Sequence, residues 1–345
     1  MIHLSSIAVE NQSDKDDNWQ TLLSQSRIST EQLLDYLGLS HHPLADTSAE
    51  SLFELRVPRP YLEKIERGNP YDPLLLQILP QKSEHLAPEN YVADPLQEKD
   101  FTPVKGLIHK YQSRVLLIAS QVCAINCRYC FRREFPYQEH RLSRQQWDAP
   151  LNYITEHPEV NEVILSGGDP LVHHNDYLFN LLEQIDAIPS VHRIRIHSRL
   201  LVSLPQRVDT VFLNRLESLR CRVIIVMHCN HPNELGEDVA SALSQLSRRN
   251  VLLLNQSVLL KDVNDDARIL AQLSERLFDM SVQPYYLFTL DRVSGAAHFD
   301  MPRARARRLY RELLSRLPGY LVPRLVEELP GEASKSPIDL RSFSN

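Results

Sequence analysis

The sequence predicts an α/β fold: a partial (βα)6 barrel, three-quarters of a TIM-like barrel, with an N-terminal helical layer and a short C-terminal arm. Short β-branched apolar runs recur from residue 114 onward, and each is followed by an amphipathic helical stretch. After the first, longer unit, successive runs start 29 to 32 residues apart, which is the period of a βα unit with short loops. Six units are two fewer than a closed TIM barrel contains, so we expect an open barrel.

The N-terminal region, residues 1–105, is predicted to be helical and interrupted by proline. Ser29-Thr-Glu-Gln32 has the pattern of a capping box and predicts the start of a helix. Four prolines break the following stretch into short helices and turns: Pro58, Pro60, Pro70 and Pro73. No motif in this region indicates chemistry, so we interpret it as a packing layer or lid.

The barrel core is predicted over residues 106–329, followed by a C-terminal segment, residues 330–345. The expected strands are Arg114–Ser120, Glu162–Gly168, Arg193–Arg199, Arg222–Cys229, Val251–Leu259 and Gln283–Leu290. The expected helices are Gln145–Glu156, Asp176–Ile188, Pro205–Leu219, Glu234–Arg249, Ala267–Met280 and Pro302–Leu317. Right-handed crossovers make these strands parallel, so their carboxyl ends share one rim, where the sites of β/α barrels form.

Composition excludes several classes of protein. The net charge of −6 gives no electrostatic footprint for nucleic acid, and no apolar run reaches the ~18 residues of a membrane span. The N-terminus lacks the basic and apolar regions of a signal peptide. Five cysteines, an odd number, do not suggest a disulfide framework. We therefore expect a cytoplasmic protein that binds neither nucleic acid nor membrane.

Three cysteines directly after the first expected strand are the most informative motif. Cys123, Cys127 and Cys130 have the spacing C-x3-C-x2-C, with no fourth cysteine nearby. Structural zinc normally takes four ligands, and a four-iron cluster usually takes four cysteines. Three thiolates would leave one iron open to another ligand; a partial zinc site is the alternative. Cys221 and Cys229 flank an apolar run and are interpreted as buried small side chains.

Polar residues also stand at the ends of the later strands. In Ser166-Gly-Gly-Asp169-Pro170, two glycines let the backbone approach a ligand closely, although a tight βα turn would use them too. Several polar groups on one rim are expected to line a pocket. The others are His197-Ser198-Arg199, His228, Asn255-Gln256-Ser257 and Asp291.

Two further signals are basic. Arg132-Arg133 follows Cys130 directly, and a guanidinium there can grip a carboxylate bidentately; a solvated basic pair is the alternative. Lys335 ends the segment Pro330-Gly-Glu-Ala-Ser-Lys335. A lone lysine near a C-terminus is usually a surface residue.

Taken together, these motifs resemble those of lysine 2,3-aminomutase and its relatives, which are radical S-adenosylmethionine (SAM) enzymes. The resemblance extends from about residue 55 to Lys335. The matching motifs are C-x3-C-x2-C-Phe-Arg-Arg, Ser-Gly-Gly-Asp-Pro, Asn-Gln-Ser-Val-Leu-Leu, Gly-x2-His-Phe and Pro-Gly-x3-Lys. The resemblance implies a radical SAM core and three cofactors: a [4Fe-4S] cluster, SAM and pyridoxal 5′-phosphate (PLP).

The resemblance also implies roles for the substrate-binding residues. Lys335 matches the lysine that carries PLP covalently. Arg132 matches the ligand of the substrate carboxylate, and Asp291 matches an acid that pairs with the ε-ammonium of lysine. Glu328 stands where the family usually has a second such acid, an aspartate.

The cofactor ligands are implied in the same way. Cys123, Cys127 and Cys130 match the cysteines that hold the iron-sulfur cluster. The segment that contains Gly167, Gly168 and Asp169 resembles the one that holds the methionine amino group of SAM. His109, Lys110, Tyr111 and Arg114 resemble a segment near the PLP phosphate. His228 and Gln256 are expected among the SAM and cofactor surroundings.

The implied reaction is isomerisation of L-α-lysine to (R)-β-lysine. The short chain and the Pro-Gly-Glu-x-Ser-Lys ending resemble a subgroup whose product modifies elongation factor P. That resemblance implies a reductant protein such as flavodoxin, and a ligase that attaches β-lysine to elongation factor P. Two alternatives stay open. The first is an aminomutase for another amino acid, such as glutamate, although the two acids, Asp291 and Glu328, would repel the side-chain carboxylate of that substrate. The second is a non-catalytic metal-binding module.

Overall fold

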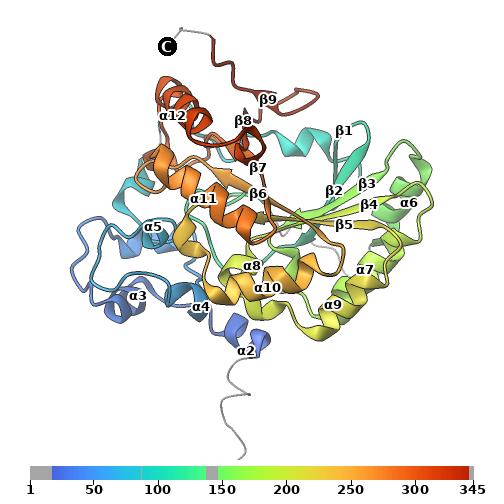
Figure 1. The fold of residues 1–345 in the computed structure, drawn as a ribbon, viewed down its shortest axis with the longest axis horizontal. Coiled ribbons are helices and arrows are strands. Elements are labelled where there is room, and N and C mark those ends of the chain that lie inside the picture. The colour runs from blue at the N-terminus through green and yellow to red at the C-terminus, as the bar shows by residue number, and fades with distance from the viewer. Residues whose placement is uncertain (1–17, 87, 137–146, 342–345) are drawn as a thin grey trace, which may run out of the picture.

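A mixed sheet of nine strands organises the computed structural model, which describes residues 18–86, 88–136 and 147–341 (Figure 1). Strands β2 to β8 are parallel neighbours in chain order, whereas β1 and β9 pair antiparallel at the two edges. The strands are β1 Leu107–Tyr111, β2 Arg114–Ser120, β3 Glu162–Gly167, β4 Arg193–Ser198, β5 Arg222–His228, β6 Leu252–Val258, β7 Gln283–Phe288, β8 Arg324–Glu327 and β9 Ser336–Pro337.

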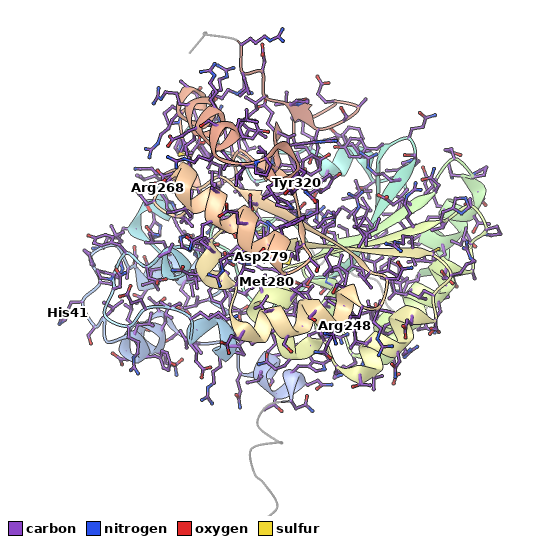
Figure 2. The ribbon with its side chains drawn as sticks, viewed as in Figure 1. His41, Arg248, Arg268, Asp279, Met280 and Tyr320 are labelled. Atoms are coloured by element: carbon purple, nitrogen blue, oxygen red, sulfur yellow. The ribbon has the colours of Figure 1, made fainter. Side chains whose placement is uncertain are left out.

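The helices between the strands cover the outer face of the sheet (Figure 1). They are α6 Asp148–Glu156, α7 Asn175–Asp186, α8 Leu200–Ser203, α9 Thr210–Glu217, α10 Glu237–Ser247, α11 Ala267–Asp279 and α12 Arg303–Arg316. Their apolar faces pack on the sheet, while polar residues such as Arg248, Arg268 and Asp279 lie on the outer surface (Figure 2). Among the described helices, none has the length and apolar character that crossing a bilayer requires.

The predicted partial (βα)6 barrel is confirmed, with three additions. Helix α12 is followed by a seventh parallel strand, β8, and the edge strands β1 and β9 were also not predicted. The helix expected over Pro205–Leu219 is interrupted: a 3₁₀ turn ends at Arg207, and Asp209 caps α9 by accepting a hydrogen bond from the Phe212 N–H. The first two residues of the helix expected from Gln145 lie outside the described residues.

The N-terminal layer consists of short helices, as predicted. They are α2 Trp19–Ser24, α3 Thr30–Leu37, α4 Arg59–Leu62 and α5 Pro73–Leu76, with 3₁₀ turns η1 Thr47–Ser51, η2 Lys82–His85 and η3 Glu98–Phe101. The capping box between Ser29 and Gln32 is present. Leu33, Tyr61 and other apolar residues of this layer form a separate cluster that includes Ile125 of the cysteine loop. The layer therefore packs directly against that loop.

Strand alternation decides which side chains reach the barrel interior. In β4, Ile194 and Ile196 are buried in the core beneath the helices, whereas Arg193, Arg195 and His197 line the interior. Burying an aliphatic side chain of this size contributes about 1.5–3 kcal/mol, so the apolar residues fix the register of the strand. The polar residues of the site are thereby held inside by the packing of their neighbours.

Candidate active site

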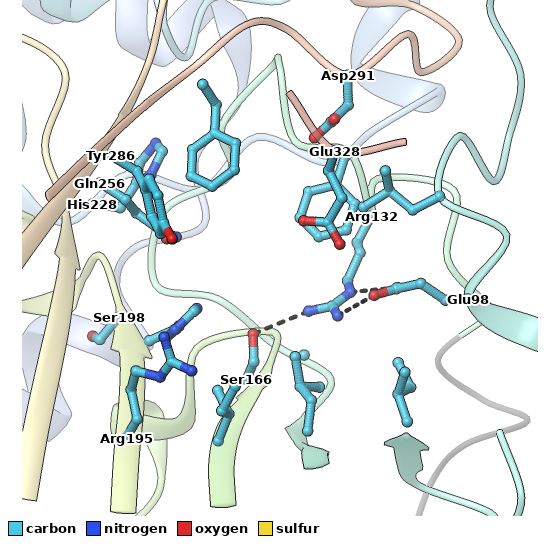
Figure 3. A pocket seen from close by; sticks show the side chains of 18 of the residues that line it. Glu98, Arg132, Ser166, Arg195, Ser198, His228, Gln256, Tyr286, Asp291 and Glu328 are labelled. Atoms are coloured by element: carbon cyan, nitrogen blue, oxygen red, sulfur yellow. Dashed lines mark hydrogen bonds and ion pairs between the residues drawn. The ribbon is translucent and has the colours of Figure 1, made fainter. Parts of the chain in front are cut away.

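A cavity of about 620 Å³ lies inside the barrel, a size typical of small-molecule sites (Figure 3). Most of the candidate site residues line this one cavity, whereas Asn255, Ser257 and His109, which were also expected there, do not. Asn255 and Ser257 alternate with Gln256 along β6 and are buried, where both donate to the Cys229 carbonyl. The residues that line the cavity include Tyr111, Arg114, Cys123, Cys127, Cys130, Arg132, Gly167, Gly168, Asp169, His228, Gln256, Asp291, Glu328 and Lys335. These residues are up to 224 positions apart in the chain (335 − 111), and the barrel brings them together.

The cysteine loop follows β2 and is fixed by the N-terminal layer. The side-chain amide of Asn126 donates to the Glu54 carbonyl at 2.9 Å, and its backbone N–H donates to the Arg56 carbonyl at 3.0 Å. The Arg128 N–H donates to the Gln77 carbonyl at 2.9 Å. These bonds hold the backbone on both sides of Cys127, so the position of this thiol depends on residues outside the barrel.

The glycine segment after β3 packs against the residues that precede Cys123. The Gly168 N–H donates to the Ser120 carbonyl at 2.8 Å, and the Asp169 N–H donates to the Val122 carbonyl at 2.9 Å. A Cβ atom on Gly168 would lie 2.5 Å from the Val122 oxygen, and Gly167 has a φ of +106°. A side chain at either position would push the two loops apart.

Asp169 ties the same segment to the end of β4. Its carboxylate accepts hydrogen bonds from the Ser198 hydroxyl at 2.8 Å and from the N–H groups of Arg199 at 2.8 Å and Leu200 at 3.0 Å. The Asp169 carboxylate therefore joins two rim loops of the barrel.

Cys123, Cys127 and Cys130 all belong to the lining of the cavity. Within the described ranges, no three Cys, His, Asp or Glu side chains converge as the ligands of one metal ion do. Each cysteine of an iron-sulfur cluster would bind a different iron, so the three thiols of such a site need not meet at a single ion. Burial raises the pKa of the Cys130 thiol to about 11, and the neighbouring Cys127 adds to that rise. Arg199 donates from Nη1 to Cys127 Sγ at 2.6 Å.

The side chains of Arg132 and Arg133, which follow the cysteine loop, point to different places. Both are buried, so they do not form the solvated basic pair that was the alternative. Arg132 lines the cavity and binds Glu98 through Nε at 2.8 Å and Nη2 at 2.5 Å, and Ser166 through Nη1 at 3.0 Å. Arg133 is buried away from the cavity lining, where its Nη2 donates to Glu84 at 2.7 Å. Figure 3 shows the Arg132 guanidinium between Glu98 and Ser166.

Glu328 directly follows β8 and collects three donors. It accepts hydrogen bonds from Lys335 Nζ at 2.5 Å, Tyr111 OH at 3.1 Å and Lys110 Nζ at 3.3 Å. Burial alone would raise the pKa of Glu328, but the two ammonium groups outweigh burial and lower it to about 2. The Tyr111 hydroxyl is thus engaged by a carboxylate, and the Arg114 guanidinium lies over the Tyr111 ring at 4.1 Å.

Asp291 lies near Glu328 but has the opposite electrostatic character. Burial raises the pKa of Asp291 to about 7, and repulsion from Glu328 adds to the effect. The two acids therefore differ in protonation near neutral pH, although both line the same end of the cavity. An incoming ammonium group would ionise Asp291 and pair with it.

Two histidines at the rim are held in their neutral form. His228 Nε2 lies 2.9 Å from the Tyr129 hydroxyl, and burial together with Arg199 lowers the pKa of His228 to about 3. Burial and the charge of Arg195 also lower the pKa of His197. Its Nε2 has no hydrogen-bond partner among the described residues, which suits an atom that receives a ligand.

A cofactor with an anionic phosphate also fits the cavity. Arg114, Arg193 and Arg195 line it, and the last two are also paired with Glu162. The buried Nε of Arg195 has no hydrogen-bond partner within the part of the chain that the structure describes. Tyr286 and Phe288 offer aromatic faces on the same wall, where Phe288 lies 5.1 Å from the Lys335 ammonium. Gln256, from the neighbouring strand β6, completes this wall.

Comparison with known proteins gives concordant matches. The model of the Radical SAM superfamily matches residues 117–273. L-lysine 2,3-aminomutase from Escherichia coli (strain K12) is 46% identical over 327 residues, which cover 94% of this chain and 95% of that protein. The protein of the same name from Haemophilus influenzae is 45% identical, with 93% and 96% covered, and that from Clostridium subterminale is 35% identical, with 94% and 79% covered.

Solved structures give a more distant match. A radical SAM methyltransferase from Sphaerobacter thermophilus has a TM-score of 0.43 and 18% sequence identity, covering 64% of this chain and 68% of that chain.

Proposed function

The chain belongs to the L-lysine 2,3-aminomutase family of radical SAM enzymes, which are isomerases, and we propose that it converts L-lysine to β-lysine. The observation that carries this proposal is the arrangement of charge in the cavity. A guanidinium, Arg132, and a pair of acids, Asp291 and Glu328, line the same space as Lys335. This arrangement offers a partner to the carboxylate and to the ε-ammonium of lysine at once.

Each chain residue then has a defined task. Arg132 binds the substrate carboxylate, while Asp291 and Glu328 bind the ε-ammonium. Lys335 would carry PLP, and Arg114 and Tyr111 would bind its phosphate. Cys123, Cys127 and Cys130 hold the [4Fe-4S] cluster. When bound, the cluster and SAM supply a radical that abstracts hydrogen from the substrate, and PLP supplies a ring that assists migration of the amino group.

The protein's own contribution is placement and the exclusion of water. The segment with Gly167, Gly168 and Asp169 lies against the residues that precede Cys123, so it would hold SAM beside the cluster. His228 and Gln256 stand on neighbouring strands between this segment and Asp291. Since the barrel interior encloses these groups, the reacting atoms are held apart from bulk solvent.

The acids at the far end of the cavity argue against glutamate as the substrate. Asp291 and Glu328 would both face the side-chain carboxylate of glutamate. Glu328 is already ionised at neutral pH, since its pKa is lowered to about 2. Two like charges at short range disfavour binding, whereas an ammonium group relieves the repulsion between the acids.

We further propose that the product is (R)-β-lysine and that a ligase attaches it to elongation factor P. The chain is 46% and 45% identical to the Escherichia coli and Haemophilus influenzae proteins but 35% identical to the clostridial protein, which supports a closer relation to the first two. A reductant protein such as flavodoxin would supply the electron. A reducing cytoplasm would preserve the cluster.

A turnover assay tests the function. Anaerobically reconstituted protein is supplied with SAM, PLP, dithionite and L-lysine, and β-lysine is measured by chiral chromatography with mass detection. Formation of β-lysine that depends on both SAM and PLP is expected, and the enantiomer tests the link to elongation factor P. SAM cleavage without β-lysine, or turnover of glutamate in its place, would contradict the substrate assignment.

The affinity for lysine is expected to depend on pH through Asp291. The pKa of this residue is about 7 without substrate, and it must lose its proton to pair with the ε-ammonium. Below about pH 7 the free enzyme carries a proton on Asp291, and this proton must leave when lysine binds. The KM for lysine should therefore rise as pH falls below about 7, by at most about tenfold per pH unit, because a single proton is involved. The measurement is KM between about pH 6 and pH 8, with Asp291→Asn as the comparison. A KM that stays constant in the parent enzyme would contradict the role of Asp291.

A further inference from the structure

We propose that Glu98, in the N-terminal layer, is the positioning residue that orients Arg132 toward the carboxylate of the substrate; this inference rests on the proposed function. Glu98 binds Arg132 through both carboxylate oxygens, at 2.8 Å to Nε and 2.5 Å to Nη2. The side chains of this pair are 11% and 4% exposed. A bidentate pair of this kind fixes the plane of the guanidinium as well as its position.

The second contact of Arg132 completes the orientation. Its Nη1 donates to the Ser166 hydroxyl at 3.0 Å, at the end of β3. The guanidinium is therefore held both by Ser166 of the barrel and by Glu98 of the N-terminal layer (Figure 3). Because a small displacement of a positioned group has a large effect on binding and reaction, the carboxylate of Glu98 is part of the specificity for α-amino acids.

The backbone around Glu98 is built to hold this side chain inward. Gln97, just before it, has a φ of +51°, a left-handed conformation that costs free energy in a residue other than glycine. The Glu98 N–H donates to the side chain of Asp94 at 3.2 Å, and the Thr102 hydroxyl donates to the Glu98 carbonyl at 3.0 Å. Both bonds fix the segment that carries Glu98.

The same segment is attached to the loop that carries Asp291. The Val92 N–H donates to the Arg292 carbonyl at 3.0 Å, and the Ser294 N–H donates to the Val92 carbonyl at 3.1 Å. Residues 92–98 thus connect the loop of Asp291 to Arg132. Asp291 is proposed to bind the ε-ammonium of the substrate, and Arg132 its carboxylate. The distance between the two substrate-binding ends is set in part by residues outside the barrel.

Glu98→Gln tests the proposal, because glutamine keeps the shape but removes the charge and one acceptor. We expect the KM for lysine to rise about tenfold or more, with a smaller change in kcat. Glu98→Asp, which keeps the charge on a shorter side chain, should give an intermediate KM. Glu84→Gln is the matched control: Glu84 also belongs to the N-terminal layer and binds Arg128 of the cysteine loop at 2.8 and 2.5 Å, but neither residue lines the cavity.

A binding measurement separates positioning from stability. Calorimetry compares L-lysine with 1,5-diaminopentane, which lacks the carboxylate, on reconstituted enzyme kept oxidised so that no turnover occurs. Glu98→Gln should weaken lysine binding and leave diamine binding unchanged. The proposal would be overturned if Glu98→Gln lost affinity equally for lysine and for the diamine. It would also be overturned if Glu98→Gln lost thermal stability, as Glu84→Gln does, but kept its affinity for lysine.

The outcome is independent of the exact substrate. If the parent enzyme binds another α-amino acid in preference to lysine, the lysine assignment fails, and the same comparison with that amino acid and its decarboxylated analogue still decides the role of Glu98. A parent enzyme whose affinity for amino acids does not depend on their carboxylate would overturn the role of Glu98 even if lysine is turned over.

Discussion

Lys335→Ala is expected to abolish both the retention of PLP and the formation of β-lysine, while leaving the iron content unchanged. Lys335 lies on the segment between β8 and β9, and the pairing of Glu327 with Ser336 fixes the backbone beside it. Its ammonium donates to Glu328 at 2.5 Å and faces the cavity beside Phe288. Among the described residues, Lys110 is the one other lysine of the cavity lining, and it is bound to Glu328 and Leu329.

Charge and covalent chemistry at Lys335 can be distinguished by a second variant. Lys335→Arg keeps a cation beside Glu328 but cannot attach the cofactor, so it should lose PLP as completely as Lys335→Ala does. Lys261→Ala is the matched control, because this lysine is exposed and lies outside the cavity lining. The measurements are the visible absorbance of bound PLP, iron content and β-lysine formation. PLP absorbance that survives in Lys335→Ala would show that another residue holds the cofactor.

The fold was predictable because its information is local and repeated. Each βα unit carries a short apolar strand and an amphipathic helix, and the period of these units alone indicates parallel strands around a barrel. Strand β8 was missed because Arg324-Leu-Val-Glu327 has only two apolar residues, too few for a pattern. Its strand conformation comes from pairing with β7 and β9, which are contacts that a sequence pattern does not contain.

The candidate site was also predictable only in part, namely where its residues form contiguous motifs. The cysteine and glycine motifs are contiguous, so they could be found as patterns, and the structure places them against each other. Their roles as ligands stay predictions. Glu98 could not be found, because it lies in an irregular segment whose position depends on the bridge from Val92 to Val293 and on the conformation of Gln97. The interpretation of the N-terminal region as a packing layer or lid gave no reason to single out Glu98, whose carboxylate holds Arg132.

The two adjacent arginines show again that contacts between distant residues decide the site. Arg132 and Arg133 are adjacent and chemically identical, so only the family resemblance, and not the residues themselves, singled out Arg132. Arg133 is buried against Glu84, which η2 brings from the N-terminal layer, whereas Arg132 meets Glu98 and lines the cavity. Which guanidinium lines the cavity is thus decided by the position of two glutamates far from them in the sequence.

Cys127→Ala is expected to remove the cluster and with it all SAM cleavage and β-lysine formation. Three thiolates are the minimum that the proposed cluster uses, and no other cysteine lines the cavity to replace one. The loop itself should stay in place, because backbone and side-chain bonds of Asn126 and Arg128 to the N-terminal layer do not involve the thiol. The variant should therefore be folded and still able to retain PLP on Lys335.

Cys221→Ala is the control for this prediction, since the same substitution is made at a cysteine outside the cavity. Cys221 is 4% exposed at the edge of β5, and its loss should cost about 1 kcal/mol of unfolding free energy without loss of iron. Iron and sulfide analysis, electron paramagnetic resonance and SAM cleavage measure the outcome. Full iron content in Cys127→Ala would contradict the assignment of Cys127 as a cluster ligand. Zinc in place of iron in the anaerobically prepared parent protein would favour a structural metal site over radical catalysis, because zinc cannot deliver the electron that cleaves SAM.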